Sequence, residues 1–375
     1  MADFALHEVF MERCLQLALL GGRSAAPNPM VGAVLVFNNK IIGEGYHRSY
    51  GGAHAEVNCI NSVKESNRDL IKQSTLYVSL EPCNHFGKTP PCTQMILDHE
   101  IGRVVVGCRD PFPLVNGKGI EKLRLSGVEV ILPVLEEKCR LLNKRFLTFH
   151  TLQRPYVILK WAESSDGFIA GQQTSNLRLS NNKLDRMVHK WRSEEMGILI
   201  GRRTAELDKP SLTTRLWPGQ SPVRIIIDPE CHTLQYLQPD GDKADDHTSS
   251  GDQDLLANNT PRNGPTIIFN LVKDSGVKRL DASGEGTVCV KLDQAANLAP
   301  QIVARLYQLN LTSVLIEGGA ITLQSFIDAG LWDEARVIRN NLLSISSGVR
   351  SPLLNSGHTA SIELIDDNLL TVYHR

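Results

Sequence analysis

Two stretches of the sequence decide the first half of the fold: His54-Ala55-Glu56 and Glu81-Pro82-Cys83-Asn84-His85-Phe86-Gly87-Lys88-Thr89-Pro90-Pro91-Cys92. His54 opens an expected helix, Cys83 follows an expected strand, and Cys92 opens a second helix. One imidazole and two thiolates form a donor set for tetrahedral zinc with one open position. A water held there would lose a proton near neutral pH, and Glu56 would carry that proton to a leaving nitrogen. The pattern therefore predicts hydrolytic deamination of an amidine-like carbon.

The spacing of the two cysteines narrows the type of deaminase. Zinc-dependent deaminases share H-x-E followed by P-C-x-x-C, whereas eight residues separate Cys83 from Cys92 here. The longer stretch, with its G-K-T-P-P-C ending, resembles the riboflavin-pathway deaminases, and the resemblance covers essentially the whole chain. The competing interpretation makes both cysteines buried thiols and His54 a capping residue. Three ligands with a correctly placed glutamate favour the metal site over that interpretation, whereas His85 either contacts substrate or only belongs to the loop.

Two further segments of this half resemble the same family. Residues 26–32 (A-P-N-P-M-V-G) resemble its substrate-binding turn, in which Asn28 can both donate to and accept from a pyrimidine edge. Asp110-Pro111 through Gly119 resembles its D-P-x-P-x-x-x-G-x-G loop. Both segments are also compatible with ordinary turns, because Pro, Asn and Gly punctuate turns in any protein.

The bulk composition limits the class of protein. A chain of 375 residues is longer than one hydrophobic core usually supports, so we expect two domains. With 40 basic and 41 acidic side chains the net charge is -1, which favours a small-molecule substrate over a nucleic-acid partner. No segment has the composition of a signal peptide or a membrane span, and the eight cysteines are then expected to be mostly reduced thiols. We therefore expect a cytoplasmic protein without a membrane partner.

The order of helix and strand patterns predicts a first domain at 1–150 and a second at 154–375, divided by the polar stretch 151–155. In the first, alternation of the two patterns predicts a three-layer α/β/α sandwich, and the resemblance identifies it as cytidine-deaminase-like. Its expected elements are a helix at 4–20, a strand at 30–37, a turn at Asn38-Asn39, a helix from His54, a strand at 75–80, a helix from Cys92, a strand at 103–107 and a helix at 135–149.

The second half shows the same alternation, interrupted by one long polar segment. Residues 239–264 are rich in Asp, Ser, Asn and Gly, which predicts an exposed, mobile loop. The expected strands are 156–161, 197–200, 223–227, 266–270 and 313–316, and the expected helices are 181–195, 298–309 and 320–329.

The second half resembles a reductase. Residues 154–167 match the R-P-(strand)-K-x-A-x-S-x-D-G opening of the riboflavin-pathway reductases, which implies a dihydrofolate-reductase-like α/β fold. Residues 201–204 and 207–215 resemble the family's G-x-x-T and D-x-P-x-L-T-x-R segments. Glu317-Gly318-Gly319 follows an expected strand and opens a helix, which suits a phosphate at the helix N-terminus. The resemblance implies NADPH as cofactor, and because no G-x-G-x-x-G follows a strand, a Rossmann site is not expected.

The resemblance also implies which residues contact each ligand. Arg192 and Arg215 could grip a ribose phosphate through two hydrogen bonds, or could be solvated surface charges. Lys160, on the first strand, has the charge to polarise the opened sugar carbonyl or its imine. Leu177 stands where many members have a cofactor-packing Trp. The cofactor positions are Ala162, Thr204, Asp208, Gly319, Ala320, Ile321, Thr322, Leu323, Gln324 and Ser325, and the substrate positions are Ser175, Arg192, Leu212, Arg215 and Glu317.

These observations lead to one hypothesis for function and two alternatives. In the first, the N-terminal domain removes the 2-amino group of 2,5-diamino-6-(5-phosphoribosylamino)pyrimidin-4(3H)-one, and the C-terminal domain reduces the ribosyl side chain to ribityl with NADPH. In the second, a nucleoside- or tRNA-type zinc deaminase carries a non-catalytic RNA-binding domain, which would need a basic face with aromatic side chains, although aromatic residues are only 6%. In the third, the C-terminal half is a scaffold for oligomerisation, and a homo-oligomer is compatible with all three.

Overall fold

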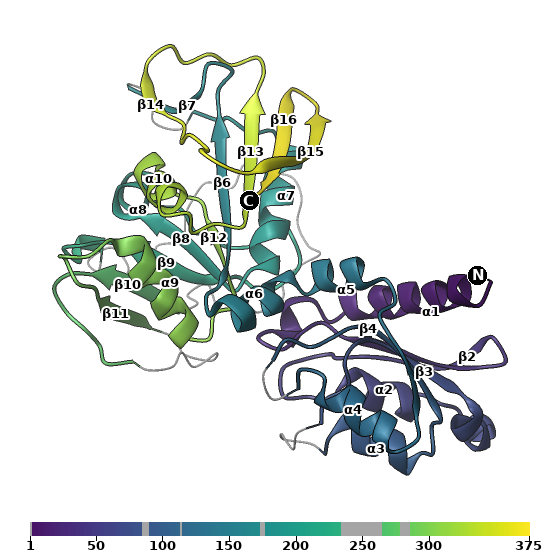
Figure 1. The fold of residues 1–375 in the computed structure, drawn as a ribbon. Helices are drawn as coiled ribbons and strands as arrows, with labels where there is room; N and C mark the ends of the chain where they lie inside the picture. Colours follow the sequence, from purple (N-terminus) through teal and green to yellow (C-terminus); the bar gives the residue numbers. More distant parts are fainter. Residues whose placement is uncertain (1, 85–89, 113–114, 173–176, 234–264, 278–285) are drawn as a thin grey trace, which may run out of the picture. The chain divides into compact units, whose positions relative to one another are not determined.

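The computed structural model describes residues 2–84, 90–112, 115–172, 177–233, 265–277 and 286–375 (Figure 1). The chain divides into two compact units, Met1–Tyr156 and Val157–Arg375. The mobile loop expected at 239–264 lies outside the described residues, as do His85 and Ser175.

The first unit is built on a five-stranded mixed sheet in the order β2-β1-β3-β4-β5. Strand β1 pairs antiparallel with β2 and β3, and β3, β4 and β5 run parallel. Asn38 and Asn39 join β1 to β2 with φ values of 44° and 60°, the left-handed conformation that a two-residue hairpin needs, so the expected turn is confirmed. The strands are β1 Gly32–Phe37, β2 Lys40–Tyr46, β3 Thr75–Leu80, β4 Arg103–Cys108 and β5 Glu129–Ile131.

Both faces of this sheet are covered. Because side chains alternate along a strand, β1 sends Ala33 and Leu35 into the core beneath α2, α3 and α4, and Val34 and Val36 into the core beneath α1. The expected three-layer α/β/α arrangement is therefore present. The helices are α1 Ala2–Leu19, η1 Gly22–Ala25, α2 Ala55–Asn61, η2 Glu65–Gln73, α3 Cys92–Asp98, α4 Lys118–Leu125, α5 Glu136–Leu142 and α6 Lys144–Leu152.

The single helix expected at 135–149 is wrong, because the chain forms two helices, α5 and α6, that meet at Asn143. Asn143 is buried, and its φ and ψ of -100° and 20° lie outside the helical range. Its side chain accepts a hydrogen bond from the Met30 N–H at 2.8 Å and donates one to the Met30 carbonyl at 2.9 Å. This bridge to a distant backbone segment accompanies the break in the helix.

The second unit contains a nine-stranded sheet in the order β11-β10-β9-β8-β12-β6-β13-β16-β15. The β11-β10-β9-β8-β12 part is parallel, β6 and β13 are parallel to each other, and β16 is antiparallel to both β13 and β15. Strands β7 and β14 form a separate antiparallel pair. The strands are β6 Tyr156–Glu163, β7 Phe168–Gly171, β8 Gly197–Gly201, β9 Val223–Ile227, β10 Thr266–Asn270, β11 Thr287–Lys291, β12 Ser313–Ile316, β13 Glu334–Asn340, β14 Gly348–Arg350, β15 His358–Ile365 and β16 Asn368–His374.

The two faces of β6 have different roles. Val157, Leu159 and Trp161 point into the largest apolar core, so Lys160 and Ala162 lie on the opposite face. The helices of this unit are α7 Asn182–Glu194, α8 Arg202–Asp208, α9 Leu298–Gln308 and α10 Ala320–Asp328.

The sequence patterns missed the strands that follow residue 330. In β15 the apolar residues Ala360, Ile362 and Leu364 alternate with Ser361 and Glu363, so the sequence does contain the period-two pattern of a strand. The structure nevertheless leaves this strand exposed along nearly all its length, including Ile362 and Leu364.

Candidate active sites

The three residues of the expected metal site come together in the first unit. His54 is the N-cap residue of α2 and Cys92 the first residue of α3, while Cys83 lies between β3 and α3. The His54 Nδ1 atom is 3.3 Å from the Cys92 Sγ and 3.6 Å from the Cys83 Sγ. All three ligand atoms lie within 4.8 Å of one another. No other group of three or more such side chains emerges from the ranges that the structure describes.

The geometry and chemistry of these side chains fit zinc. Bonds of about 2.0 Å to nitrogen and about 2.3 Å to sulfur in a tetrahedron separate the ligand atoms by about 3.5 Å, close to the distances found here. A hydrogen bond from Cys92 lowers the pKa of Cys83 to about 4, and the neighbouring His54 acts in the same direction. Cys83 therefore favours the thiolate form that binds metal, whereas the same hydrogen bond raises the pKa of Cys92, which keeps its proton until a metal displaces it.

Glu56 is placed to move a proton beside these ligands. It is the second residue of α2, its side chain is buried, and it forms a hydrogen bond with Cys92. Burial raises the pKa of Glu56, while the His54 charge opposes the increase. A carboxyl group whose pKa is raised toward neutrality can both accept and return a proton.

Asn28 is held by a histidine that the sequence did not single out. The His47 Nδ1 is 3.0 Å from the Ala53 carbonyl, so Nδ1 carries the proton and Nε2 accepts from the Asn28 side-chain amide at 3.1 Å. Burial lowers the pKa of His47, which favours this neutral form. Among the described residues no donor reaches the Asn28 Oδ1, so it can accept a hydrogen bond from a ligand. His47 directly follows β2, and no sequence spacing links it to Asn28.

The D-P loop also contributes a buried acid. Asp110 is buried after β4, and its Oδ1 accepts from the Phe112 N–H at 2.8 Å. Burial raises the pKa of Asp110 to about 7, and the nearby charges of Glu81 and Cys83 add to this effect. The loop therefore lies close to the metal ligands.

In the second unit, Lys160, Arg192 and Glu317 form a buried ionic cluster. The Arg192 Nε and Nη2 each donate to one oxygen of Glu317 at 2.8 Å, and the Lys160 Nζ lies 3.9 Å from Oε2. Burial alone would raise the pKa of Glu317, but Arg192 and Lys160 lower it to about 2. Burial lowers the pKa of Lys160, while Glu317 opposes the decrease. Glu317 is therefore a carboxylate that holds two cations.

Arg192 makes contacts other than the expected grip on a phosphate. Its third nitrogen, Nη1, donates to the Thr213 carbonyl at 3.2 Å, so all three guanidinium nitrogens have protein partners. Arg215 is exposed and donates to the Ser211 hydroxyl at 2.8 Å. Leu212 is buried with a φ of 55°. Of the two arginines, Arg215 is therefore the more accessible to an anion.

His189 is a second residue that sequence reasoning missed. It is buried on α7, one turn before Arg192. Burial lowers its pKa to about 4, and the charges of Arg192 and Arg215 add to this effect. A lone histidine within a helical pattern gives no sequence signal of this environment.

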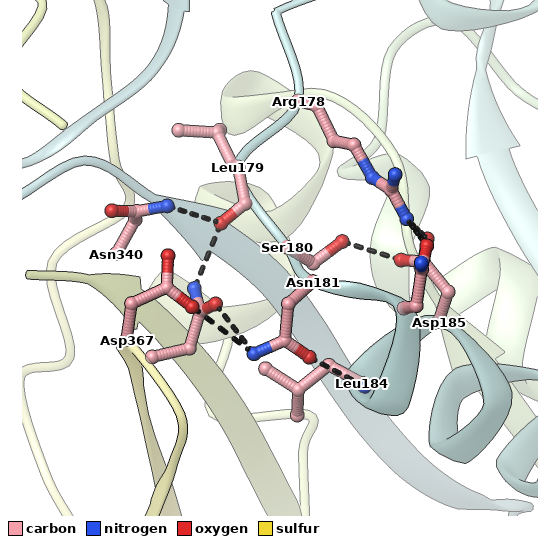
Figure 2. A network of polar contacts seen from close by, with 10 residues as sticks. Arg178, Leu179, Ser180, Asn181, Leu184, Asp185, Asn340 and Asp367 are labelled. Carbon is pink, nitrogen blue, oxygen red and sulfur yellow. Dashed lines mark hydrogen bonds and ion pairs between the residues drawn. The ribbon is translucent and has the colours of Figure 1, made fainter. Parts of the chain in front are cut away.

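A polar network anchors the start of α7, which carries Arg192 (Figure 2). The Asn181 Oδ1 caps the helix by accepting from the Leu184 N–H at 3.0 Å, and its amide donates to Asp367 and Asn368. The side-chain amides of Asn340 and Asn368 both donate to the Leu179 carbonyl. The residues just after Leu177 are therefore fixed to the ends of β13 and β16.

The expected cofactor positions cluster where two helices begin. Strands β8 and β12 are parallel neighbours, so α8 and α10 start at the same edge of the sheet. The two helix starts lie close together. A Cβ added to Gly201 would be 2.7 Å from the Thr322 Oγ1 of α10, and one added to Gly319, whose φ is 66°, would be 3.5 Å from the Thr204 Oγ1 of α8. Ligands of open α/β sheets bind at such edges.

The remaining expected cofactor positions are more scattered. Ala162 lies on β6, and Asp208 is exposed at the end of α8. On α10, Ile321 is exposed, whereas the Leu323 side chain is buried in the apolar core. Gln324 forms hydrogen bonds with the backbone of Leu353.

No helix in the described ranges is both long enough and apolar enough to cross a membrane.

Each half of the chain matches a known protein family. The family model described as "Cytidine and deoxycytidylate deaminase zinc-binding region" matches residues 5–108, and that of the "RibD C-terminal domain" matches residues 155–343. The riboflavin biosynthesis protein RibD of Aquifex aeolicus is 38% identical over 349 residues, which cover 91% of this chain and 90% of that protein. RibD of Bacillus amyloliquefaciens is 35% identical, with coverage of 94% and 88%.

Solved structures agree with these matches. A crystal structure of a diaminohydroxyphosphoribosylaminopyrimidine deaminase/5-amino-6-(5-phosphoribosylamino)uracil reductase from Thermotoga maritima has a TM-score of 0.81 at 31% identity, with 99% of each chain covered. RibD of Acinetobacter baumannii gives a TM-score of 0.80 at 25% identity with the same coverage. The fold class expected from the sequence, a cytidine-deaminase-like domain followed by a reductase domain, is confirmed.

Proposed function

Because the chain belongs to the RibD family of riboflavin biosynthesis proteins, we propose which of its residues carry out the two reactions of that family. The first reaction is hydrolytic deamination of 2,5-diamino-6-(5-phosphoribosylamino)pyrimidin-4(3H)-one. The second is reduction of the ribosyl side chain to ribityl. The first unit would perform the deamination and the second the reduction.

In the deaminase unit, His54, Cys83 and Cys92 would hold zinc. The ion would supply a Lewis acid that makes a water molecule acidic near neutral pH. Glu56 moves the protons of that water: one goes to the ring nitrogen as the C–O bond forms, and the other goes to the amino nitrogen as ammonia leaves, so that a C=O bond replaces the C–NH2 bond. Asn28, oriented by His47, holds the edge of the pyrimidine through its Oδ1.

In the reductase unit, NADPH would lie across the edge where α8 and α10 begin, and it would supply the hydride. Thr204, Gly319 and the residues of α10 from Ala320 to Ser325 would bind it there, with Ala162 and Asp208 completing the contacts. Lys160 donates a hydrogen bond to the opened sugar carbonyl or its imine, and Glu317 holds the Lys160 ammonium in place. Arg215, Leu212, Arg192, Glu317 and Ser175 are the proposed substrate positions.

One observation carries the proposal: three metal-ligating side chains meet within 4.8 Å beside the buried Glu56 carboxyl. The pattern is typical of a zinc deaminase and of no simple binding module. We further propose a cytoplasmic enzyme whose partner is a small phosphorylated pyrimidine, with neither nucleic acid nor membrane required.

The test is a single time course with purified enzyme, the diaminopyrimidinone ribosyl phosphate and NADPH, in which ammonia release and NADPH oxidation are followed together. Ammonia should appear first, and NADPH loss should follow it. In Glu56→Gln both signals should vanish, and adding the deaminated intermediate should restore NADPH oxidation. Glu129→Gln, which alters an exposed ion pair with Arg103, is the matched control. If ammonia appears but NADPH is never consumed, the C-terminal half is better explained as a scaffold for oligomerisation than as a reductase.

A further inference from the structure

Glu81 belongs to the E-P-C motif but is not one of the three metal-ligating residues. It is buried, and its backbone N–H donates to the Cys108 carbonyl at 3.0 Å, so it is fixed where β3 and β4 end. Glu81 lies two positions before Cys83 in the chain, and its side chain reaches Asp110 and the start of α4.

The Glu81 carboxylate accepts hydrogen bonds from four backbone N–H groups. Oε2 accepts from Gly117 at 3.0 Å and from Asp110 at 3.4 Å, and Oε1 accepts from Gly119 at 3.0 Å and from Ile120 at 3.4 Å. A helix starts with four N–H groups that lack partners within it. In α4 three of them bind Glu81, and the fourth, of Lys118, donates to the Val115 carbonyl at 2.7 Å.

These contacts tie both ends of the D-P loop to one side chain. Asp110 stands at its start and Gly117 at its end, where the φ of Gly117 is 84°. A Cβ on Gly119 would lie 2.1 Å from the Pro82 carbonyl oxygen, so only glycine lets α4 approach this closely. The Asn84 amide adds a longer contact of 3.5 Å to the Lys118 carbonyl.

We propose that Glu81 is a positioning residue of the deaminase site, which holds Asp110 and the first residues of α4 in place beside Cys83 so that the pyrimidine meets Asp110 and the metal-binding residues together. The role rests on the proposed deaminase function. It requires a carboxylate, because a carboxylate only accepts hydrogen bonds, whereas an amide would turn an NH2 group toward two N–H donors.

The experiment compares Glu81→Gln with Glu129→Gln and the parent. It measures kcat and KM for ammonia release, zinc per chain, and NADPH oxidation from the deaminated intermediate. Glu81→Gln should raise the KM for deamination by about tenfold or more, because two buried donors lose their acceptor. Zinc content should stay unchanged because Glu81 is not one of the three proposed ligands. Reduction should stay unchanged because Glu81 lies outside the reductase unit. General destabilisation would instead reduce the active fraction, and therefore kcat, at constant KM.

Gly119→Ala provides a second test that keeps the carboxylate, because its Cβ would lie 2.1 Å from the Pro82 carbonyl oxygen and 3.3 Å from the Glu81 Oε1 and would force α4 away from both. It should raise the same KM, and it decides the question if Glu81→Gln fails to fold or to retain zinc. A KM for deamination equal to that of the parent, in either folded variant, would overturn the role of Glu81. A parent protein that releases no ammonia at all would overturn the proposed function itself.

Discussion

Replacing Arg192 with Met would leave the Glu317 carboxylate buried without its principal partner. In the parent, two hydrogen bonds of 2.8 Å join the guanidinium to both carboxylate oxygens, and the side chains are only 12% and 7% exposed. Lys160, at 3.9 Å, would be the remaining cation near Glu317. Met keeps most of the apolar stem of Arg, so the substitution removes mainly the charge and its hydrogen bonds.

The expected loss of stability can be estimated in two ways. Breaking one partner of a buried ion pair costs about 3–5 kcal/mol. The ordinary pKa of 4.5 for Glu317 falls to about 2 in the fold, which corresponds to about 3 kcal/mol. For a unit of this size, with a urea m-value of about 2–3 kcal/mol/M, the unfolding midpoint should fall by about 1–2 M.

Tryptophan fluorescence reports the unfolding of the second unit alone. All four tryptophans, at positions 161, 191, 217 and 332, lie in Val157–Arg375, so their emission in urea follows that unit alone. Lys190→Met, which breaks an exposed pair with Glu194 on the same helix, is the control and should cost no more than about 0.5 kcal/mol. NADPH oxidation should be lost in Arg192→Met, while ammonia release should continue.

The triple variant Lys160→Met/Arg192→Met/Glu317→Leu separates stability from chemistry. With all three charges of the cluster gone, it should regain most of the lost stability and remain inactive as a reductase. If Arg192→Met unfolds at the midpoint of the parent, or if the triple variant is less stable than Arg192→Met, the assignment of a buried ionic cluster is wrong.

Three further predictions use the same assays. Lys160→Met should slow NADPH oxidation by about 100-fold and leave ammonia release unchanged, and an equal loss of both activities would count against its role in reduction. Removal of the metal with a chelator should abolish ammonia release, which added Zn²⁺ should restore, and should leave reduction of the deaminated intermediate intact; ammonia release that survives complete metal removal would exclude zinc. Because the pKa of Glu317 is lowered to about 2, its stabilisation is fully present above about pH 4.5 and is lost as the pH falls from there toward 2. Acid unfolding followed by tryptophan emission should show this loss in the parent and not in Glu317→Gln.

Features that depend on neighbouring residues were predictable from the sequence. The limits of β3, β9, β10 and β12 agree with the expected strands, because each is a short apolar run bounded by turn residues. The Asn38-Asn39 hairpin follows from the tolerance of Asn for left-handed backbone. The zinc-deaminase motif is equally compact, because two of its ligands flank one loop.

Features that depend on a distant partner were not predictable. The break at Asn143 accompanies a bridge to Met30, 113 residues away, and Arg192 meets Glu317 across 125 residues. His47 lies beside Asn28 and His54 only because β2 ends next to the start of α2.

The sequence by itself determined the two-domain α/β class, the family resemblance and the three candidate metal ligands, because periodicity, turn chemistry and motif spacing are local properties of the chain. Only the tertiary structure decided which partner each buried polar group takes. The Arg192 guanidinium binds the Glu317 carboxylate, and the Glu81 carboxylate accepts a hydrogen bond from the Asp110 N–H. The physical reason is that a buried charge or N–H group must find a partner within about 3 Å, and that partner comes from whichever segment the fold brings there.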